Sequence, residues 1–269
     1  MKTHIRSLIH FSLLLLLGLA PGCSGDTDLE TPGPVAIDRS ANLQAAGDSA
    51  ADLLTNQDFD RIRIQIAYVN GFRPTTETLD NLRAFLLERT FKTDITFEFL
   101  ALPSPGETSL SLEEVAVLEN ENRTLYNDGR ELAIYIYFTD APADGDDMDA
   151  GTFTLGAVYR NTSMVIHENT IRNISDRSVL ITTADVETAT LHHEFGHLFG
   201  LVDLSTPEVN PHEDAEAANH CNVDGCLMQA KLEFSASAKS FLEARALKGA
   251  AVPGLDAECI RDLQAIGGR

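Results

Sequence analysis

The chain has 269 residues, a length that accommodates one large domain or two small ones. Apolar residues make up 43% of the sequence, which is ordinary for a globular protein and sufficient for a sizeable core. The formal net charge of −21 at pH 7 argues against nucleic acid and anionic membrane surfaces as partners, because both would repel an acidic protein.

The N-terminus has the features of a targeting segment. Lys2 and Arg6 precede an apolar, leucine-rich run at residues 11–20, which is shorter than a membrane-spanning helix requires. Ala-Pro-Gly-Cys ends the run, and small residues before a cysteine resemble the bacterial lipobox. We therefore predict a signal peptide with a lipobox over residues 1–23, lipidation of Cys23 and a location in the bacterial cell envelope. Plain secretion and a retained anchor are the alternatives.

The segment that follows differs in composition from the rest of the chain. Residues 24–58 are rich in Gly, Pro, Asp and Ser and show no sustained hydrophobic period. Such a composition is typical of a segment that does not contribute to an apolar core. We predict a flexible tether over residues 24–58 and one monomeric domain over residues 59–269.

Within this domain the hydrophobic pattern alternates between period two and period 3.6, which predicts strands interspersed with amphipathic helices. In chain order we expect a strand at residues 61–66, a helix at 76–90, a strand at 94–100, a helix at 109–122, a central strand at 131–139, a strand or hairpin at 152–167, and helices at 183–201, 235–248 and 256–266. His167 and Glu168 are expected at the surface. The order predicts an α/β (α+β) fold with a mixed twisted sheet and a loop-rich C-terminal part.

The helix at residues 183–201 carries the residues best suited to chemistry. His193 and His197 are four positions apart, so on a helix both imidazoles project from one face, one turn apart. This separation lets two nitrogens bind one tetrahedral zinc ion. Glu194 follows the first histidine, where it can accept a proton from an attacking water molecule. The pattern predicts a hydrolytic zinc centre, whereas an exposed polar helix face is the structural alternative.

Two residues further along the chain favour the zinc centre. Gly200 follows His197 by three positions, and a glycine there can take a left-handed conformation, end the helix and return the chain towards the metal. A third protein ligand is then needed, and candidates follow at once. Met228 lies downstream in a Cys-Leu-Met sequence.

These residues give the chain a resemblance to the metzincin zinc peptidases, and within them it is most similar to the archaemetzincins. The archaemetzincin signature runs H-E-x-x-H-x-x-G-x-x-H-C, then four residues, then C-x-M. Residues 193–200 match its first part, and residues 220–228 keep the spacing of its second part. The two parts are separated here by an insertion, residues 202 to about 219. The resemblance is strong over residues 190–229, weak over the N-terminal strands and absent before residue 59.

The resemblance implies a metzincin-like fold in which a turn containing Met228 lies under the metal. It further implies Zn²⁺ as cofactor, a peptide or protein substrate, and hydrolysis of peptide bonds with Glu194 as general base. The chain lacks the tyrosine that some metzincins carry just after the methionine.

The insertion leaves three candidates for the third zinc ligand. His220 belongs to the block that ends at Met228, and we favour it. Asp203 follows Gly200 by three positions, where some metzincins carry a carboxylate. His212 lies within the insertion, which should otherwise form a rim over the cleft.

The resemblance also bears on three cysteines. Archaemetzincins hold a structural zinc with four cysteines, of which Cys221 and Cys226 match the first pair. Cys259 matches the second pair, with Asp256 in place of its partner. A Cys221–Cys226 disulfide is the simpler outcome in an oxidising compartment. A metal site is the alternative, weakened because a hard carboxylate replaces a soft thiolate.

Together these features predict an exported zinc peptidase or endopeptidase that contacts a membrane only through its lipid. A catalytically inactive surface lipoprotein that acts as a binding module is the alternative, and a metal scavenger is a third possibility. The intact pair of histidines with Glu194 argues against the binding module, which has no need of them.

Overall fold

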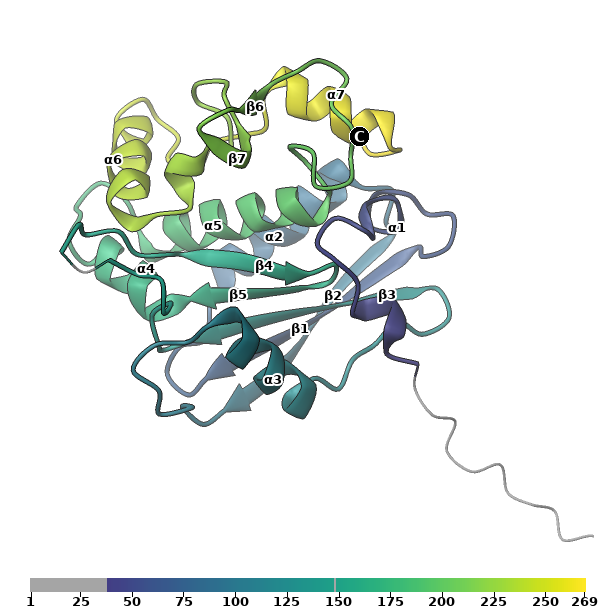
Figure 1. The fold of residues 1–269 in the computed structure, drawn as a ribbon, viewed down its shortest axis with the longest axis horizontal. Coiled ribbons are helices and arrows are strands. Elements are labelled where there is room, and N and C mark those ends of the chain that lie inside the picture. Colours follow the sequence, from purple (N-terminus) through teal and green to yellow (C-terminus); the bar gives the residue numbers. More distant parts are fainter. Residues whose placement is uncertain (1–37, 148) are drawn as a thin grey trace, which may run out of the picture. The chain divides into compact units, whose positions relative to one another are not determined.

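The structure is a computed structural model that describes residues 38–147 and 149–269. Its centre is a five-stranded sheet with the strand order β2-β1-β3-β5-β4 (Figure 1). The strands are β1 (Arg61–Val69), β2 (Asp94–Leu102), β3 (Glu131–Thr139), β4 (Gly156–Arg160) and β5 (Ser163–His167). The first four in spatial order are parallel, and β4 pairs antiparallel with β5. The sheet is therefore mixed, with β4 at one edge.

Helices cover both faces of the sheet. One face packs against α2 (Thr76–Arg89) and α5 (Thr183–Leu198), and the other packs against α3 (Leu112–Asn122) (Figure 1). The central strand β3 is buried at every position but its first, which explains its β-branched and aromatic composition. The predicted α/β class and the predicted central strand are confirmed.

Local sequence sets the limits of α5, the helix that carries the histidine pair. Thr182 and Asp185 form a capping box at its start, each side chain accepting a hydrogen bond from the other residue's backbone N–H. At its end, Gly200 has φ +73° and the N–H of Leu201 donates to the carbonyl of Gly196 at 3.0 Å. The expected left-handed glycine therefore ends the helix, as a C-terminal cap requires.

The C-terminal part of the chain lies on the far side of α5 from the sheet (Figure 1). It contains the short strands β6 (Glu213–Asp214) and β7 (Ala217–Cys221), the 3₁₀ turn η2 (Ala230–Leu232), and the helices α6 (Ser235–Ala246) and α7 (Ala257–Ala265). Loops connect them, as predicted. No helix in the described part of the chain has the length and apolarity needed to cross a bilayer.

The domain begins earlier than predicted, because residues 38–58 fold against it. They include the 3₁₀ turn η1 (Ser40–Asn42) and the helix α1 (Ala50–Leu54), whose Leu53 and Leu54 are fully buried. Residues 38–58 of the predicted tether are thus structured. Much of this segment is held in place by hydrogen bonds of individual polar residues. Such contacts produce no hydrophobic period in the sequence, so the segment was not recognised as part of the domain. The remaining predictions for the N-terminus, including Cys23, lie outside the described residues.

The end of β5 also departs from expectation. His167 and Glu168 are buried, not at the surface, because an unpredicted helix α4 (Glu168–Ser175) begins there and packs against α5. Nδ1 of His167 donates to the carbonyl of Ala141 at 2.8 Å, and Glu168 accepts from Nε of Arg172 at 2.6 Å. The ring of His167 and Oε1 of Glu168 thus have hydrogen-bond partners inside the domain, whereas Oε2 of Glu168 has none among the described residues.

Candidate metal centre and cleft

Three histidines from two elements converge beside the sheet. His193 and His197 lie on α5 and His220 lies on β7, and one ring nitrogen of each falls within 4.8 Å of the others. The Nε2 atoms of His193 and His197 are 3.2 Å apart. Two nitrogen ligands of a tetrahedral zinc ion, each about 2.0–2.1 Å from the metal, are separated by about 3.3 Å. The donor set therefore fits zinc.

Backbone carbonyls orient two of these rings. Nδ1 of His193 lies 2.8 Å from the carbonyl of Leu227, and Nδ1 of His220 lies 2.9 Å from the carbonyl of Ala218. A carbonyl only accepts, so each Nδ1 carries the proton and each Nε2 keeps its lone pair for a metal. Nε2 of His220 is buried and has no hydrogen-bond partner among the described residues. A bound cation would satisfy it.

Met228 lies against α5 between the two histidines of the helix. A Cβ placed on Gly196 would overlap Sδ of Met228, so the methionine occupies the space that this glycine leaves open. The carbonyl of Met228 also accepts the N–H of Cys221 at 2.7 Å. The methionine turn therefore ties α5 to β7, where the third histidine lies.

Glu194 is the fourth polar residue of the centre. It is almost fully buried, and it lines a cavity of about 250 Å³ together with His197, His220 and residues 156–158 of β4. The backbone of Val158 hydrogen-bonds the Glu194 carboxylate. A Cβ on Gly156 would lie 3.1 Å from Cγ of Glu194, so this glycine lets β4 approach α5 closely.

Burial determines the protonation of the centre. It lowers the pKa of His193 to about 4 and that of His197 well below its usual value, so both imidazoles are neutral at pH 7, as metal ligands must be. Burial, followed by the charge of Glu233, raises the pKa of Glu194 to about 8. A cation bound beside Glu194 would lower this pKa again.

The other two candidates for the third ligand lie elsewhere. Asp203 is exposed, has φ +66° and is not among the converging groups of the described chain. The turn that follows Gly200 directs it to the surface. His212 is buried, and its Nε2 lies 3.4 Å from Sγ of Cys259. The inserted segment thus places His212 at the cysteines, and not at the rim of the cleft as expected.

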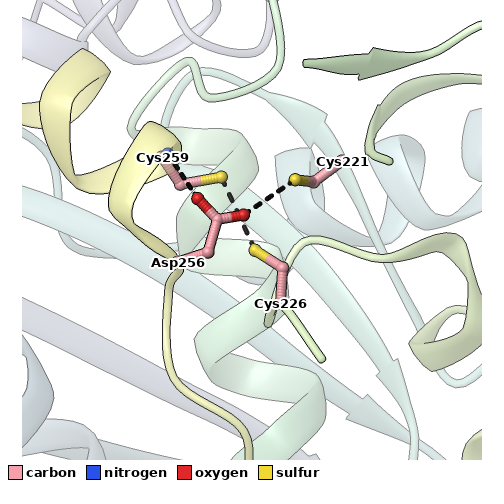
Figure 2. A group of neighbouring side chains, drawn as sticks. All are labelled: Cys221, Cys226, Asp256 and Cys259. Carbon is pink, nitrogen blue, oxygen red and sulfur yellow. Dashed lines mark hydrogen bonds between the residues drawn. The ribbon is translucent and has the colours of Figure 1, made fainter. Parts of the chain in front are cut away.

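The three cysteines form a second cluster with Asp256, and Figure 2 shows the four side chains pointing towards one another. Sγ of Cys226 and Sγ of Cys259 are 3.6 Å apart, and the Cys221 thiol donates to Oδ2 of Asp256 at 3.0 Å. Thiolates on one tetrahedral zinc are separated by about 3.7 Å. All three cysteines are free, so the structure contains no Cys221–Cys226 disulfide.

Asp256 has two roles at this cluster. Its Oδ1 accepts the backbone N–H groups of Glu258 and Cys259, at 2.6 and 3.0 Å, and so caps the start of α7. Its Oδ2 remains available to the cluster. Interactions with the side chains of Cys221 and Cys259 hold the pKa of Cys226 below its usual value, which favours a thiolate there.

Sequence reasoning missed Glu233. Its side chain is 33% exposed, it lines the cavity, and its Oε2 lies 3.4 Å from Nε2 of His220. No motif spacing indicates this residue, because it is brought to the centre by the turn after Met228 and not by a helix shared with the histidines. An edge strand within residues 156–159 was expected near the site, but the close approach to α5 that Gly156 allows was not predicted.

Comparisons with known proteins were made by sequence and by structure. No family model and no curated protein matches the sequence. The structure is similar to that of an archaemetzincin from Methanopyrus kandleri, with 15% identity and a TM-score of 0.47, covering 77% of this chain and 96% of that one. It is also similar to a zinc-dependent peptidase from Methanocorpusculum labreanum (strain Z), with 14% identity and a TM-score of 0.43, covering 74% and 99%.

Proposed function

We propose that this chain is a zinc-dependent peptidase in which His193, His197 and His220 hold the catalytic Zn²⁺ and Glu194 is the general base. The convergence of three imidazole nitrogens next to a buried glutamate, at a cavity, carries this proposal. Three neutral nitrogen ligands leave one position of a tetrahedral zinc open, which is typical of catalytic sites and not of structural ones.

Zinc held there would polarise the scissile carbonyl and lower the pKa of the attacking water. The carboxylate of Glu194 accepts the proton of that water and delivers it to the leaving nitrogen. The contact with the Val158 backbone holds the carboxylate at the cavity wall.

The substrate is proposed to bind along β4. This strand pairs with β5 on one side and ends the sheet on the other, and its residues 156–158 line the cavity. Unpaired backbone groups of an edge strand can hydrogen-bond an extended peptide as an added strand. A peptide bound in this way would pass Glu194 with its backbone at the reacting centre.

The Glu194→Ala variant tests the catalytic role. We expect the wild type to bind zinc and to cleave peptides of a mixed library in a chelator-sensitive reaction. Glu194→Ala should retain the catalytic zinc and lose activity by about a hundredfold or more. Undiminished cleavage by Glu194→Ala, or a wild type that binds no zinc, would refute the proposal.

The zinc content of two further variants tests the ligand set. His220→Ala should lose the catalytic zinc, because only two protein nitrogens would remain. Asp203→Ala should retain it, since Asp203 is exposed and outside the converging groups. The reverse result would assign the third ligand to Asp203.

We also propose that the cysteine cluster holds a second, structural zinc and that the chain is exported and lipidated at Cys23. The first proposal is supported by the four ligand atoms within 4.8 Å of one another. The second rests on the N-terminal sequence alone. Palmitate labelling of the chain expressed in bacteria, lost in Cys23→Ala, is the expected result, and equal labelling of both would contradict it.

A further inference from the structure

Glu233 adds a second carboxylate to the cavity, across from Glu194. Its position is held by the backbone on two sides. The N–H of Leu155 donates to the Glu233 carbonyl at 3.0 Å, and the N–H of Glu233 donates to the carbonyl of Ala230 at 3.1 Å. Phe234 pairs with Thr154 directly before β4. Glu233 is therefore fixed beside the entry to the strand on which a substrate would lie.

The charge of this carboxylate has one partner among the described residues, the imidazole of His220. That ring is 6% exposed, and its Nε2 has no hydrogen-bond partner in the described chain. When Nε2 of His220 binds a metal, its lone pair is used and the ring is a neutral ligand. Because Nδ1 of His220 donates its proton to the carbonyl of Ala218, Nε2 has no proton to offer to Glu233.

No lysine or arginine lines the cavity, which contains two carboxylates instead. The metal and its open position are adjacent to Glu194, whereas Glu233 extends the negative charge beyond the metal ligands. A bound zinc ion would offset part of this negative charge, and a cationic group on the substrate could form a charge-assisted contact with Glu233. The net charge of −21 on the chain would attract the same class of substrate from solution.

From this geometry we propose that Glu233 selects peptides that carry a cationic nitrogen next to the scissile bond. This inference rests on the proposed function, since it names the substrate class of the same cavity. The cation has two possible sources with the same chemistry, namely a free α-ammonium group or the side chain of lysine or arginine. Glu233 is a specificity residue here, because it contacts the substrate and takes no part in proton transfer.

The experiment measures peptide binding and does not require turnover. Four fluorescent hexapeptides of one sequence carry either lysine or its neutral isostere norleucine, with a free or an acetylated N-terminus. Their Kd values are determined by anisotropy with the zinc-loaded Glu194→Ala protein at physiological salt. The same titrations are repeated with a protein that carries both Glu194→Ala and Glu233→Gln. The second substitution keeps the shape of the side chain and removes its charge.

A control variant changes the same charge outside the cavity. Glu216 is exposed on the turn between β6 and β7 and does not line the cavity. Glu216→Gln therefore reports any effect of overall charge. Zinc content is measured in all three proteins, because a purely structural role of Glu233 would change zinc content or weaken all four peptides equally.

We expect a cationic peptide to bind about tenfold or more tightly than its neutral isostere, as charge-assisted contacts allow. Glu233→Gln should bring this ratio close to one at unchanged zinc content, and Glu216→Gln should retain it. Loss of the preference on acetylation identifies the α-ammonium source, and loss with norleucine identifies the side chain. The inference is overturned if the Kd values of the neutral and cationic peptides are nearly equal in the parent protein. It is also overturned if Glu233→Gln retains the preference for the cationic peptide.

The two proposals fail separately. If the wild type binds zinc and cleaves peptides but does not prefer cationic ones, the peptidase proposal holds and the proposed role of Glu233 is refuted. If the wild type binds no zinc, the peptidase proposal fails, and the same peptide ratios measured on the metal-free protein still decide whether Glu233 recognises cations.

Discussion

At the scale of single residues, two glycines determine how closely the elements around the metal centre approach each other. Gly196 leaves the space that Met228 fills, and Gly156 lets β4 lie against Glu194. Both act through the absence of a side chain, and neither is in the left-handed region. Their contribution is one of packing and not of backbone freedom.

Replacing Gly196 tests this packing. Gly196→Ala should lower the free energy of unfolding by about 1–3 kcal/mol, because the added methyl overlaps Met228 and a well-packed interior cannot absorb it. It should also weaken zinc binding, since the methionine turn leads to His220. Urea titration and a zinc competition assay measure the two effects. Gly145→Ala, whose Cβ would meet no atom within 4 Å, is the control; equal behaviour of both variants would contradict the prediction.

Glu168 makes stability depend on pH. Burial raises its pKa to about 9, and the nearby charge of Glu187 adds to this, although Arg172 opposes both. The folded state therefore keeps a proton on Glu168 that the unfolded state releases near the ordinary value of 4.5. Stability from this group is complete below pH 4.5 and is lost as pH rises towards 9, by about 1.4 kcal/mol per pH unit at most.

The Glu168→Gln variant should remove this dependence, because an amide does not titrate. Unfolding free energies at pH 5 and pH 8 are to be compared between wild type and variant. We expect the wild type to lose more stability than Glu168→Gln between these values. The same loss in both proteins would assign the pH dependence to other groups.

At the scale of elements, β7 connects the two candidate metal sites. It carries His220 at one site and, as the next residue, Cys221 at the other. Hydrogen bonds also tie it to the methionine turn, through the N–H of Cys221 and the carbonyl of Met228. Filling the cysteine site would therefore restrain the strand that positions the third histidine.

Variants of the cysteine cluster test this connection. Cys259→Ser should remove the second zinc and weaken the binding of the first, because β7 loses an anchor. Asp256→Asn keeps the cap of α7, since asparagine is an equally good N-cap, and removes only the carboxylate charge. It should weaken the second zinc with little effect on the helix. The zinc content of each variant reports on the metal sites, and circular dichroism at 222 nm reports on the helices. If Cys259→Ser retains two zinc ions per chain, the cysteine cluster is not a zinc site.

At the scale of the whole molecule, the segment before β1 belongs to the domain. Nδ2 of Asn42 donates to the carbonyl of Ala133 at 3.1 Å, and Oγ of Ser205 donates to the carbonyl of Gly47 at 2.6 Å. Ala46 lines the cavity. The segment thus contributes both to stability and to the wall of the cleft.

Truncation tests this assignment. Chains that begin at residues 24 and 38 serve as references. A chain that begins at residue 48 should be less stable by about 2 kcal/mol or more, because it leaves buried hydrogen-bond partners of Asn42 unsatisfied. Thermal unfolding measures all three, and equal stability of the shortest chain would show that residues 38–47 are dispensable.

Short-range patterns were enough to predict most of the elements and half of the metal centre. Strands, helices and their caps depend on neighbouring residues, and His193, Glu194 and His197 share one helix, so their spacing alone predicts a common face. The short helices α1 and α4 have only five and eight residues, too few for a helical period to stand out, and they were not predicted.

The remaining part of the centre required the tertiary structure. From the sequence we expected a third ligand after Gly200, and His220, Asp203 and His212 were all compatible with that role. The choice depends on where a long insertion folds, and it folds so that His212 meets Cys259 and His220 meets α5. The place of Glu233 at the cavity was likewise not predictable from the sequence and became visible only in the tertiary structure. Contacts between distant segments are decided by packing of the whole chain, which no local period encodes.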